Sequence, residues 1–243
     1  MKVFGITDRG AVRSENQDRF QYKLEEEKDL AILVLCDGMG GAKAGTLAAA
    51  TGAAAFMTHA SLCLHEKNPP DAEIIVRESA SYANIRVYDR ARKDEDCAGM
   101  GCTLVAALLQ GEDCSLVNIG DSRAYLYSNG VLRQLTRDHS LVEDLVERHA
   151  ITREEARVHP RRNVITRAVG LDYRVKSDVF HTKLQPGDKL LLCSDGLSNV
   201  VEMESIRAIV AGHTEPESAA RELLERALEG GAPDNVTALL LFR

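Results

Sequence analysis

The sequence predicts an α+β fold in which antiparallel sheets carry helices on their outer faces. Strand candidates occur in successive runs rather than in strict alternation with helices, and long helical patterns separate these runs. The order of the runs favours two sheets packed face to face. At 243 residues, with 44% hydrophobic and 28% charged content, the chain is long enough and apolar enough to form one large domain with a sizeable core.

Ten segments rich in Val, Ile, Leu and Tyr are predicted to be strands. They are Val3–Thr7, Arg19–Leu24, Leu30–Cys36, Thr103–Leu109, Ser115–Ile119, Ala124–Ser128, Val131–Leu135, Val175–Thr182, Lys189–Cys193 and Val236–Phe242. Ala124–Ser128 and Val131–Leu135 are predicted to form a hairpin. Asn129-Gly130 between them supplies the positive φ angles of a tight turn.

Three helices are predicted, at Ala44–Leu64, Asp71–Arg92 and Glu215–Leu228. The second places Ile74, Ile75, Ala80 and Ala83 near one face. The third begins after a cap at Thr214, with Pro216 at the first helical position.

Residues 138–165 interrupt the β-rich pattern. Their many charges indicate short helices, so we interpret them as an insertion or flap.

Composition and charge exclude several classes of protein. The net charge of -7, without a long basic run, disfavours a nucleic-acid partner. No charge-free apolar stretch reaches the roughly 18 residues of a membrane span, and the N-terminus lacks the apolar core of a secretory signal. The six cysteines form no C-x-x-C pair and the seven histidines lack ligand spacing. We therefore expect reduced, mostly buried cysteines in a cytoplasmic protein, and no zinc site.

The stretch Leu30–Thr46, LAILVLCDGMGGAKAGT, has the pattern of a phosphate-binding loop: an apolar strand, glycines, then an alanine-rich helix. Two such motifs fail in detail. The third glycine of a dinucleotide fingerprint falls on Lys43, and Thr46 stands where a Walker A lysine must follow Gly45. An acid, Asp37, also stands where phosphate would come closest. A nucleotide-binding function therefore remains only as a remote alternative.

Four aspartates stand where apolar runs end or begin, and three of them are next to glycine. They are Asp37, Asp121, Asp195 and Asp234. Each alone is explained by ordinary turn chemistry. If the strand ends meet, however, four carboxylates would repel one another unless a cation neutralises them. Oxygen ligands favour a hard cation such as Mg²⁺ or Mn²⁺. The pattern therefore predicts a loop that holds metal, which in turn holds phosphate.

Eight motifs, in order over nearly the whole chain, resemble those of the metal-dependent serine/threonine protein phosphatases of the 2C type, especially the bacterial stand-alone domains. They are RSENQD (13–18), DGMGG (37–41), GMGCT (99–103), NIGDSRAY (118–125), LTRDHS (135–140), TRAVG (166–170), LLLCSDGLSN (190–199) and GGAPDNVT (230–237). The resemblance implies a four-layer α-β-β-α sandwich of two mostly antiparallel sheets flanked by helices, with a metal centre at one edge. Residues 1–243 would then be a single phosphatase catalytic domain, with 138–165 as its flap.

By this resemblance, Asp37 would bridge two Mn²⁺ or Mg²⁺ ions and the Gly38 carbonyl would bind one of them. Asp195 and Asp234 would complete the ligands of the second ion. Asp121 would help Asp195 to hold a third, weaker ion found in bacterial members. Asp18 would hold metal-bound waters in the outer shell, and Arg13 would bind the substrate phosphate.

The implied reaction is the hydrolysis of phosphoserine and phosphothreonine in proteins by a metal-activated water, without a covalent intermediate. Cysteine-dependent phosphatases carry C-x-x-x-x-x-R, and no cysteine here has arginine six positions later. The expected partners are phosphorylated proteins, targets of bacterial serine/threonine kinases. The chain is expected to be a monomer, because no heptad seam is present. The alternative from another class is a catalytically silent regulatory or binding module with the same fold.

Some positions depart from the family pattern or have no certain role. Met39 stands where some members have a histidine assigned as general acid. His139 and His159 are candidates for that role, although a capping or surface position is the simpler reading of both. Cys102 replaces a usual threonine, which we interpret as a packing variation. Arg161 and Arg162 in the flap are further candidates to touch substrate, against the alternative of a solvated turn.

Overall fold

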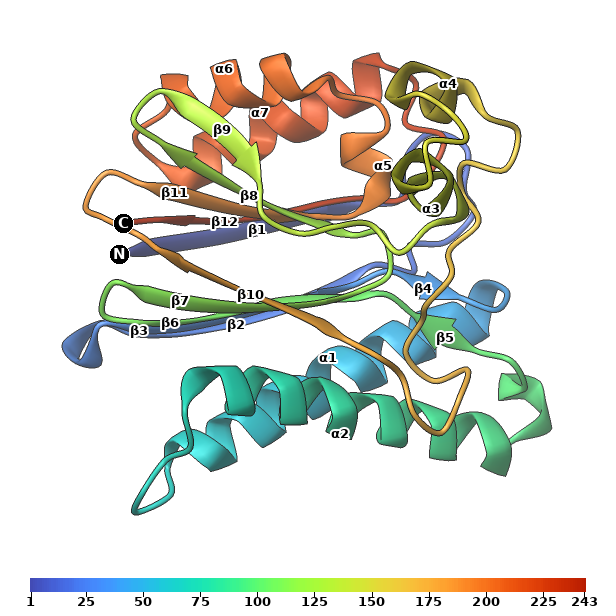
Figure 1. The fold of residues 1–243 in the computed structure, drawn as a ribbon, viewed down its shortest axis with the longest axis horizontal. Helices are drawn as coiled ribbons and strands as arrows, with labels where there is room; N and C mark the ends of the chain where they lie inside the picture. Colours follow the sequence, from blue (N-terminus) through green and yellow to red (C-terminus); the bar gives the residue numbers. More distant parts are fainter.

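The computed structural model describes residues 1–243, except for the side chain of Ala42. Figure 1 shows four layers, with the sheets between α1 (Ala42–Leu64) and α2 (Ala72–Lys93) on one outer face and α6 (Met203–Gly212) and α7 (Pro216–Glu229) on the other. The first sheet has the order β1-β12-β11-β8-β9 and the second β10-β7-β6-β3-β2, with neighbouring strands antiparallel. A two-stranded pair, β4 with β5, lies beside them. The fold class expected from the sequence is confirmed.

Ten of the twelve strands correspond to the predicted segments with shifts at their ends, and the two-residue strands β4 and β5 were not predicted. Their bounds are β1 Lys2–Asp8, β2 Arg19–Glu25, β3 Leu30–Cys36, β4 Gly38–Met39, β5 Gly101–Cys102, β6 Leu104–Gln110, β7 Asp113–Ile119, β8 Arg123–Ser128, β9 Val131–Gln134, β10 Asp178–Lys183, β11 Lys189–Cys193 and β12 Val236–Phe242. The hairpin between β8 and β9 turns at Asn129 and Gly130, whose φ angles are 51° and 83°. The predicted start of β10 at Val175 is wrong, because β7 offers partners only from Asp178 onward.

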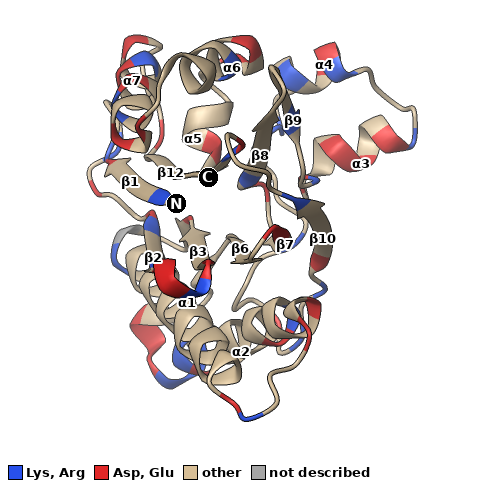
Figure 2. Ribbon diagram, turned by 90° about the vertical axis from the view of Figure 1, so that its left-hand side faces the viewer, with Lys and Arg blue, Asp and Glu red and all other residues tan. Residues whose placement is uncertain are grey.

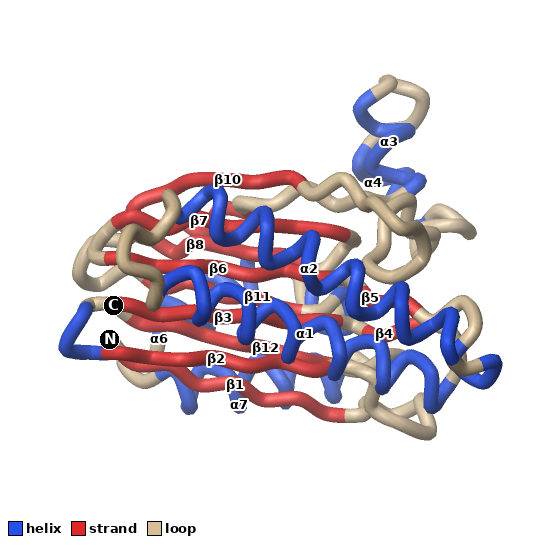
Figure 3. Tube along the Cα trace, turned by 90° about the horizontal axis from the view of Figure 1, so that it is seen from below, coloured by secondary structure: helices blue, strands red, loops and turns tan.

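The α-helices are α1 Ala42–Leu64, α2 Ala72–Lys93, α3 Leu141–Glu147, α4 Arg153–Val158, α5 Asp195–Ser198, α6 Met203–Gly212 and α7 Pro216–Glu229. Single 3₁₀ turns stand at Glu26–Lys28 and Glu95–Cys97. The short helices expected in 138–165 are α3 and α4. Figure 3 shows α1 and α2 lying across one sheet and α3 and α4 projecting at one end of the molecule. The sequence prediction missed α6, although Ile206, Ile209 and Val210 have helical spacing and are buried.

Two details of the helix predictions are wrong. Ile74 is 43% exposed, because the buried face of α2 runs through Ile75, Ala80 and Ala83, and Ile74 points to its side. The N-cap of α7 is Glu215 rather than Thr214, although Pro216 does occupy the first turn.

The core lies in three layers, and β3 shows how one strand serves two of them. Its residues alternate: Ala31, Leu33 and Leu35 pack between the two sheets, whereas Ile32 and Val34 pack under α1 and α2. Period-two alternation puts successive side chains on opposite faces, so a strand covered on both faces is apolar throughout. All six cysteines are free and buried, as predicted.

Among the described helices, one has the length and apolar composition of a membrane span, at Lys43–Leu64 within α1. The expectation that no charge-free apolar stretch reaches this length is therefore wrong. This helix packs against α2 and β3, and its alanines contribute to the core beneath it. Its apolar character is therefore accounted for by packing. Figure 2 shows acidic and basic residues interspersed on the outer helices, with acids along α3.

Candidate active site

The sheet topology brings the polar strand ends to one edge of the sandwich. Because the strands are antiparallel, the ends of β3 and β7 and the start of β2 meet at the same edge of one sheet, as do the ends of β1 and β11 and the start of β12 in the other. A cavity of about 630 Å³ lies there, which we call the acidic pocket. Its walls contain all four aspartates predicted as metal ligands, together with Arg13 and Gly38. They are Asp37, Asp121, Asp195 and Asp234.

Asp37 is held by its backbone at the end of β3. Its N–H donates to Thr103 Oγ1 at 2.9 Å, and Thr103 N–H donates back to the Asp37 carbonyl at 2.8 Å. Thr103 Oγ1 also lies 2.7 Å from Ser122 Oγ, which ties this loop to the one that carries Asp121. These backbone bonds fix the position of Asp37 at the pocket.

Glycines let the loops of the pocket touch. A Cβ on Gly196 would lie 2.0 Å from the Asn235 carbonyl oxygen, so only glycine allows the loop of Asp195 to approach that of Asp234. A Cβ on Gly38 would meet the Gly45 carbonyl oxygen at 2.1 Å. Gly38 is therefore required for the close approach of α1, a reason that the sequence did not reveal.

Two aspartates of the pocket are held by neighbouring side chains. Arg13 Nη2 donates to Asp234 Oδ2 at 2.7 Å, and Asn199 Nδ2 donates to Asp195 Oδ2 at 3.0 Å. Asp195 Oδ1 is buried and accepts no hydrogen bond within the part of the chain that is described.

Asp18 lies behind the pocket and is fully buried. Its Oδ2 accepts hydrogen bonds from Ser194 Oγ at 2.7 Å and Thr237 Oγ1 at 2.6 Å. Its Oδ1, like that of Asp195, has no partner among the described residues. A buried carboxylate oxygen without a donor is costly, so both atoms indicate a positively charged or hydrogen-bonding ligand.

The aspartates raise one another's pKa values. Burial, followed by repulsion from neighbouring carboxylates, raises the pKa of Asp37 and of Asp195 well above the usual range. Burial is also the main cause that raises the pKa of Asp18 and of Asp121, each to about 6. Hydrogen bonding to Asp234 raises the pKa of Arg13. The pocket therefore favours any ligand that brings positive charge.

The donor set fits a hard divalent cation. The pocket offers carboxylate oxygens, which Mg²⁺ and Mn²⁺ prefer, and one of them is already buried without a donor. As the side chains stand, no three His, Cys, Asp or Glu residues in the described part of the chain converge closely enough to hold an ion. Mutual repulsion and the bonds from Arg13 and Asn199 account for this spread. Rotation of the aspartate side chains would have to accompany metal binding.

The loop that carries Arg13 is anchored by Asn235, a residue that the sequence analysis did not single out. Asn235 Nδ2 donates to the carbonyl oxygens of Arg9 and Glu15, both at 2.9 Å, and its Oδ1 accepts from Gln17 N–H at 2.9 Å. Asn235 follows Asp234 directly, so a single turn before β12 supplies both a pocket carboxylate and the anchor of the arginine loop. The guanidinium of Arg13 stays 53% exposed at the rim.

The flap contributes Asn163 and Ile165 to the pocket wall, whereas Arg161 and Arg162 are exposed and are not among the residues that line it. Sequence reasoning named the two arginines and missed their neighbours. Contact of the arginines with substrate remains a prediction.

The two histidines differ from each other. His159 is the C-cap residue of α4, as expected. The expectation that His139 is a capping or surface residue is wrong, since it is only 2% exposed, and it is not among the residues that line the pocket.

Comparison with known proteins agrees with this geometry. Residues 4–236 match the family model "Protein phosphatase 2C". The serine/threonine phosphatase stp of Listeria monocytogenes is 36% identical over 98% of this chain and 94% of its own length. The crystal structure of the Mycobacterium tuberculosis serine/threonine phosphatase PstP/Ppp has a TM-score of 0.88 and 36% identity, and the match covers 100% of this chain and 99% of that one.

A structure of the catalytic domain of PstP in complex with two manganese ions is also similar, with a TM-score of 0.83 and 35% identity over 98% of this chain and 96% of that one. The enzyme class expected from the sequence, a protein serine/threonine phosphatase, is confirmed by these matches. The chain belongs to the protein phosphatase 2C family.

Proposed function

We propose that the chain removes phosphate from phosphoserine and phosphothreonine in proteins with the help of two divalent cations, Mn²⁺ or Mg²⁺, held in the acidic pocket. The observation that carries the proposal is the convergence of four aspartates and Arg13 on one cavity, with a buried Asp195 oxygen that lacks a donor. The manganese complex of the similar PstP domain supports the choice of a divalent metal.

The proposed ligands are those expected from the sequence. Asp37 would contact both ions and the Gly38 carbonyl one of them, while Asp195 and Asp234 would complete the second. Asp121 would hold a third, weaker ion together with Asp195. When bound, the two principal ions would supply a nucleophile from water at neutral pH and offset the charge of the phosphate.

The chain's own residues would then orient the substrate. Arg13 presents a guanidinium at the rim, and its exchange of Asp234 for a substrate phosphate would form a bidentate, charge-assisted contact. Asn235 would keep this arginine in register with the pocket floor. Asp18, fixed by Ser194 and Thr237, would orient water at the inner side of the site.

Residues 138–165 would act as a flap within a single catalytic domain of residues 1–243. Asn163 and Ile165 line the same pocket as Arg13, although they lie far from it in the sequence. They would contact the peptide on either side of the phosphorylated residue. Targets of serine/threonine kinases, a cytoplasmic location and a monomeric state remain predictions.

The test is phosphate release from a phosphothreonine peptide under three conditions: with Mn²⁺, with EDTA, and with Mn²⁺ and the Asp37→Ala variant. Turnover in the first condition alone is expected. Metal binding is measured separately by calorimetry. Silence in all three conditions, with Mn²⁺ bound to the unmodified protein, would contradict the proposal and favour a regulatory module. Equal turnover with EDTA would remove the metal from the mechanism.

A further inference from the structure

His139 is a buried histidine outside the acidic pocket that contacts three separate segments. These are the loop between β7 and β8, which carries Asp121, the segment by which the flap returns to the body, and the start of β10. Gly120 N–H donates to His139 Nδ1 at 3.1 Å, and His139 N–H donates to the Gly120 carbonyl at 2.9 Å. His139 thus holds the residue directly before Asp121 through both of that residue's backbone polar groups, the N–H with its ring and the carbonyl with its own backbone N–H.

The hydrogen bonds determine which nitrogen of the ring carries the proton. Because Nδ1 accepts from Gly120 N–H, the neutral ring has its proton on Nε2, which lies 3.2 Å from Asp178 Oδ2 and 3.0 Å from Arg167 Nη1. Arg167 Nη1 donates to the other oxygen of the same carboxylate at 2.8 Å. Asp178 therefore fixes the ring from the side opposite Gly120, in the way that a carboxylate orients a histidine elsewhere.

The backbone of His139 also fixes the returning segment of the flap. Thr166 N–H donates to the His139 carbonyl at 2.8 Å, and Leu141 N–H donates to the Val164 carbonyl at 2.8 Å. Ser140 and Ile165 form an antiparallel bridge between these bonds. Ile165, which forms this bridge, and Asn163, in the turn just before it, both line the pocket.

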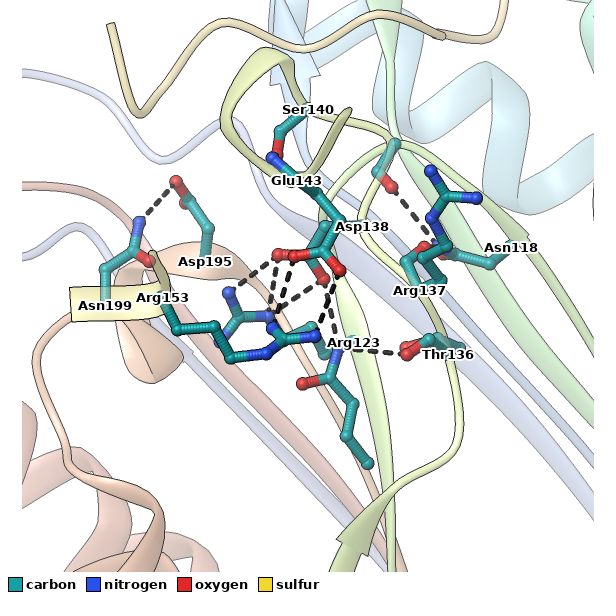
Figure 4. A network of polar contacts seen from close by, with 12 residues as sticks. Asn118, Arg123, Thr136, Arg137, Asp138, Ser140, Glu143, Arg153, Asp195 and Asn199 are labelled. Carbon is teal, nitrogen blue, oxygen red and sulfur yellow. Dashed lines mark hydrogen bonds and ion pairs between the residues drawn. The ribbon is translucent and has the colours of Figure 1, made fainter. Parts of the chain in front are cut away.

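Asp138, the residue directly before His139, also binds the loop that carries Asp121. Asp138 accepts three hydrogen bonds from the guanidinium of Arg123, at 2.6 to 3.0 Å, as Figure 4 shows. Asp138 and His139 therefore form hydrogen bonds with this loop at Arg123 and at Gly120, on either side of Asp121. The Asp138 contact holds a side chain, whereas the His139 contact holds the backbone next to Asp121.

We propose that His139 is a positioning residue that holds the Asp121 loop and the Asn163–Ile165 wall of the flap in one fixed relation across the acidic pocket. The expected effect of His139 on catalysis rests on the proposed function, whereas its effect on the Asp121 loop and the flap does not. Loss of the imidazole leaves the buried Gly120 N–H without an acceptor, which frees the loop on the Asp121 side. The same loss removes the bond to Asp178 and loosens the flap side.

Three variants distinguish the role of Nδ1 of His139 from that of Nε2. His139→Ala removes both, His139→Asn keeps an acceptor at the position of Nδ1, and His139→Gln keeps a donor near Nε2 but no acceptor for Gly120. His181→Asn is the matched control. His181 also pairs Nδ1 with a side chain, Ser115 Oγ at 3.1 Å, and Nε2 with a carboxylate, Glu73 Oε2 at 3.1 Å, but it touches neither pocket wall.

The first readout is exchange of the Gly120 amide hydrogen, followed by NMR without any substrate. We expect exchange to be about tenfold or more faster in the Ala and Gln variants, and unchanged in the Asn variant and in His181→Asn. Equal protection of Gly120 in all four variants would overturn the inference.

The second readout is the pair kcat and KM, measured with a phosphothreonine peptide and with p-nitrophenyl phosphate. Displacement of Asp121 should lower kcat for both substrates about tenfold in His139→Ala, whereas a loosened flap should raise KM for the peptide alone. A purely structural role would lower kcat for both by the fraction of protein lost and leave KM unchanged. That result, or an Asn variant as impaired as Ala, would contradict the inference. If the unmodified protein shows no turnover, the proposed function fails. Exchange of the Gly120 amide hydrogen would still decide whether His139 holds the Asp121 loop.

Discussion

Two sets of buried aspartates lie around the same strand ends, and they differ in how completely their oxygens are satisfied. Asp138 accepts from Arg123 on both oxygens and from Gln134 Nε2 at 3.1 Å. Asp18 and Asp195 each keep one buried oxygen without a partner among the described residues. Figure 4 shows the contrast between the crowded Asp138 and Asp195, whose drawn contact is with Asn199.

The difference teaches how to separate structural from functional carboxylates. A buried charge that only supports the fold is paired and fully hydrogen-bonded, because an unsatisfied one costs free energy. A group of neighbouring aspartates with incomplete bonds and raised pKa values is stable only if a ligand completes it. Asp138 has the features of the first kind, and Asp18 and Asp195 have those of the second.

The largest expected effect is on Asp195. Replacing it by Asn should lower kcat about 10³-fold, because a proposed ligand is lost and with it the hold on the cation that would offset the developing phosphate charge. The free energy of unfolding in EDTA should stay the same or increase, since Asn keeps an acceptor for Asn199 and removes repulsion. Steady-state kinetics and urea unfolding of the same preparation check both parts. A large loss of stability in EDTA would place Asp195 with the structural carboxylates.

Asp138→Asn should show the opposite behaviour. It leaves Arg123 without its partner, and we expect the free energy of unfolding to fall by about 2 kcal/mol, less than for a fully buried pair because the Arg123 side chain is 23% exposed. Urea unfolding in EDTA measures the change, with Asp195→Asn as the comparison. If Asp138→Asn were the more stable variant, the distinction between the two sets would be wrong.

The pH dependence of the metal-free protein should sharpen the contrast further. Burial raises the pKa of Asp18 to about 6, so in the folded state its charged form is disfavoured and stability falls as pH rises from its unfolded pKa through 6. In EDTA, wild type should gain about 1 kcal/mol from this group between about pH 7.5 and pH 5, relative to Asp18→Asn. Parallel pH profiles of the two proteins would contradict the assignment.

The smallest effect is expected at an exposed pair. Arg153 in α4 contacts Glu143 in α3 at 3.3 Å, with the arginine side chain 71% exposed. Arg153→Ala should change the free energy of unfolding by less than about 0.5 kcal/mol, because such pairs are screened by solvent. Thermal unfolding with and without added salt measures it. A loss above about 1 kcal/mol would show that the flap depends on this pair for its fold.

Much of the fold was predictable because its signals are local. The runs Leu30–Cys36 and Val236–Phe242 carry the nearly continuous apolar pattern of strands covered on both faces, and Asn129-Gly130 encodes its own turn. The four aspartates were predictable for a related reason: each ends or precedes an apolar run, and antiparallel strands bring such ends to one edge. The short α6 was missed because its pattern spans fewer than three turns.

The sequence by itself determined the layers, the strand ends and the four aspartates that line the acidic pocket, since these follow from periodicity and from chemistry carried by single positions. Only the tertiary structure decided that Asn163 and Ile165, rather than Arg161 and Arg162, line the pocket, that Asn235 anchors the arginine loop, and that His139 is buried against Gly120. These facts join residues far apart along the chain, often in different sheets. They depend on strand register and loop packing, which no local pattern encodes.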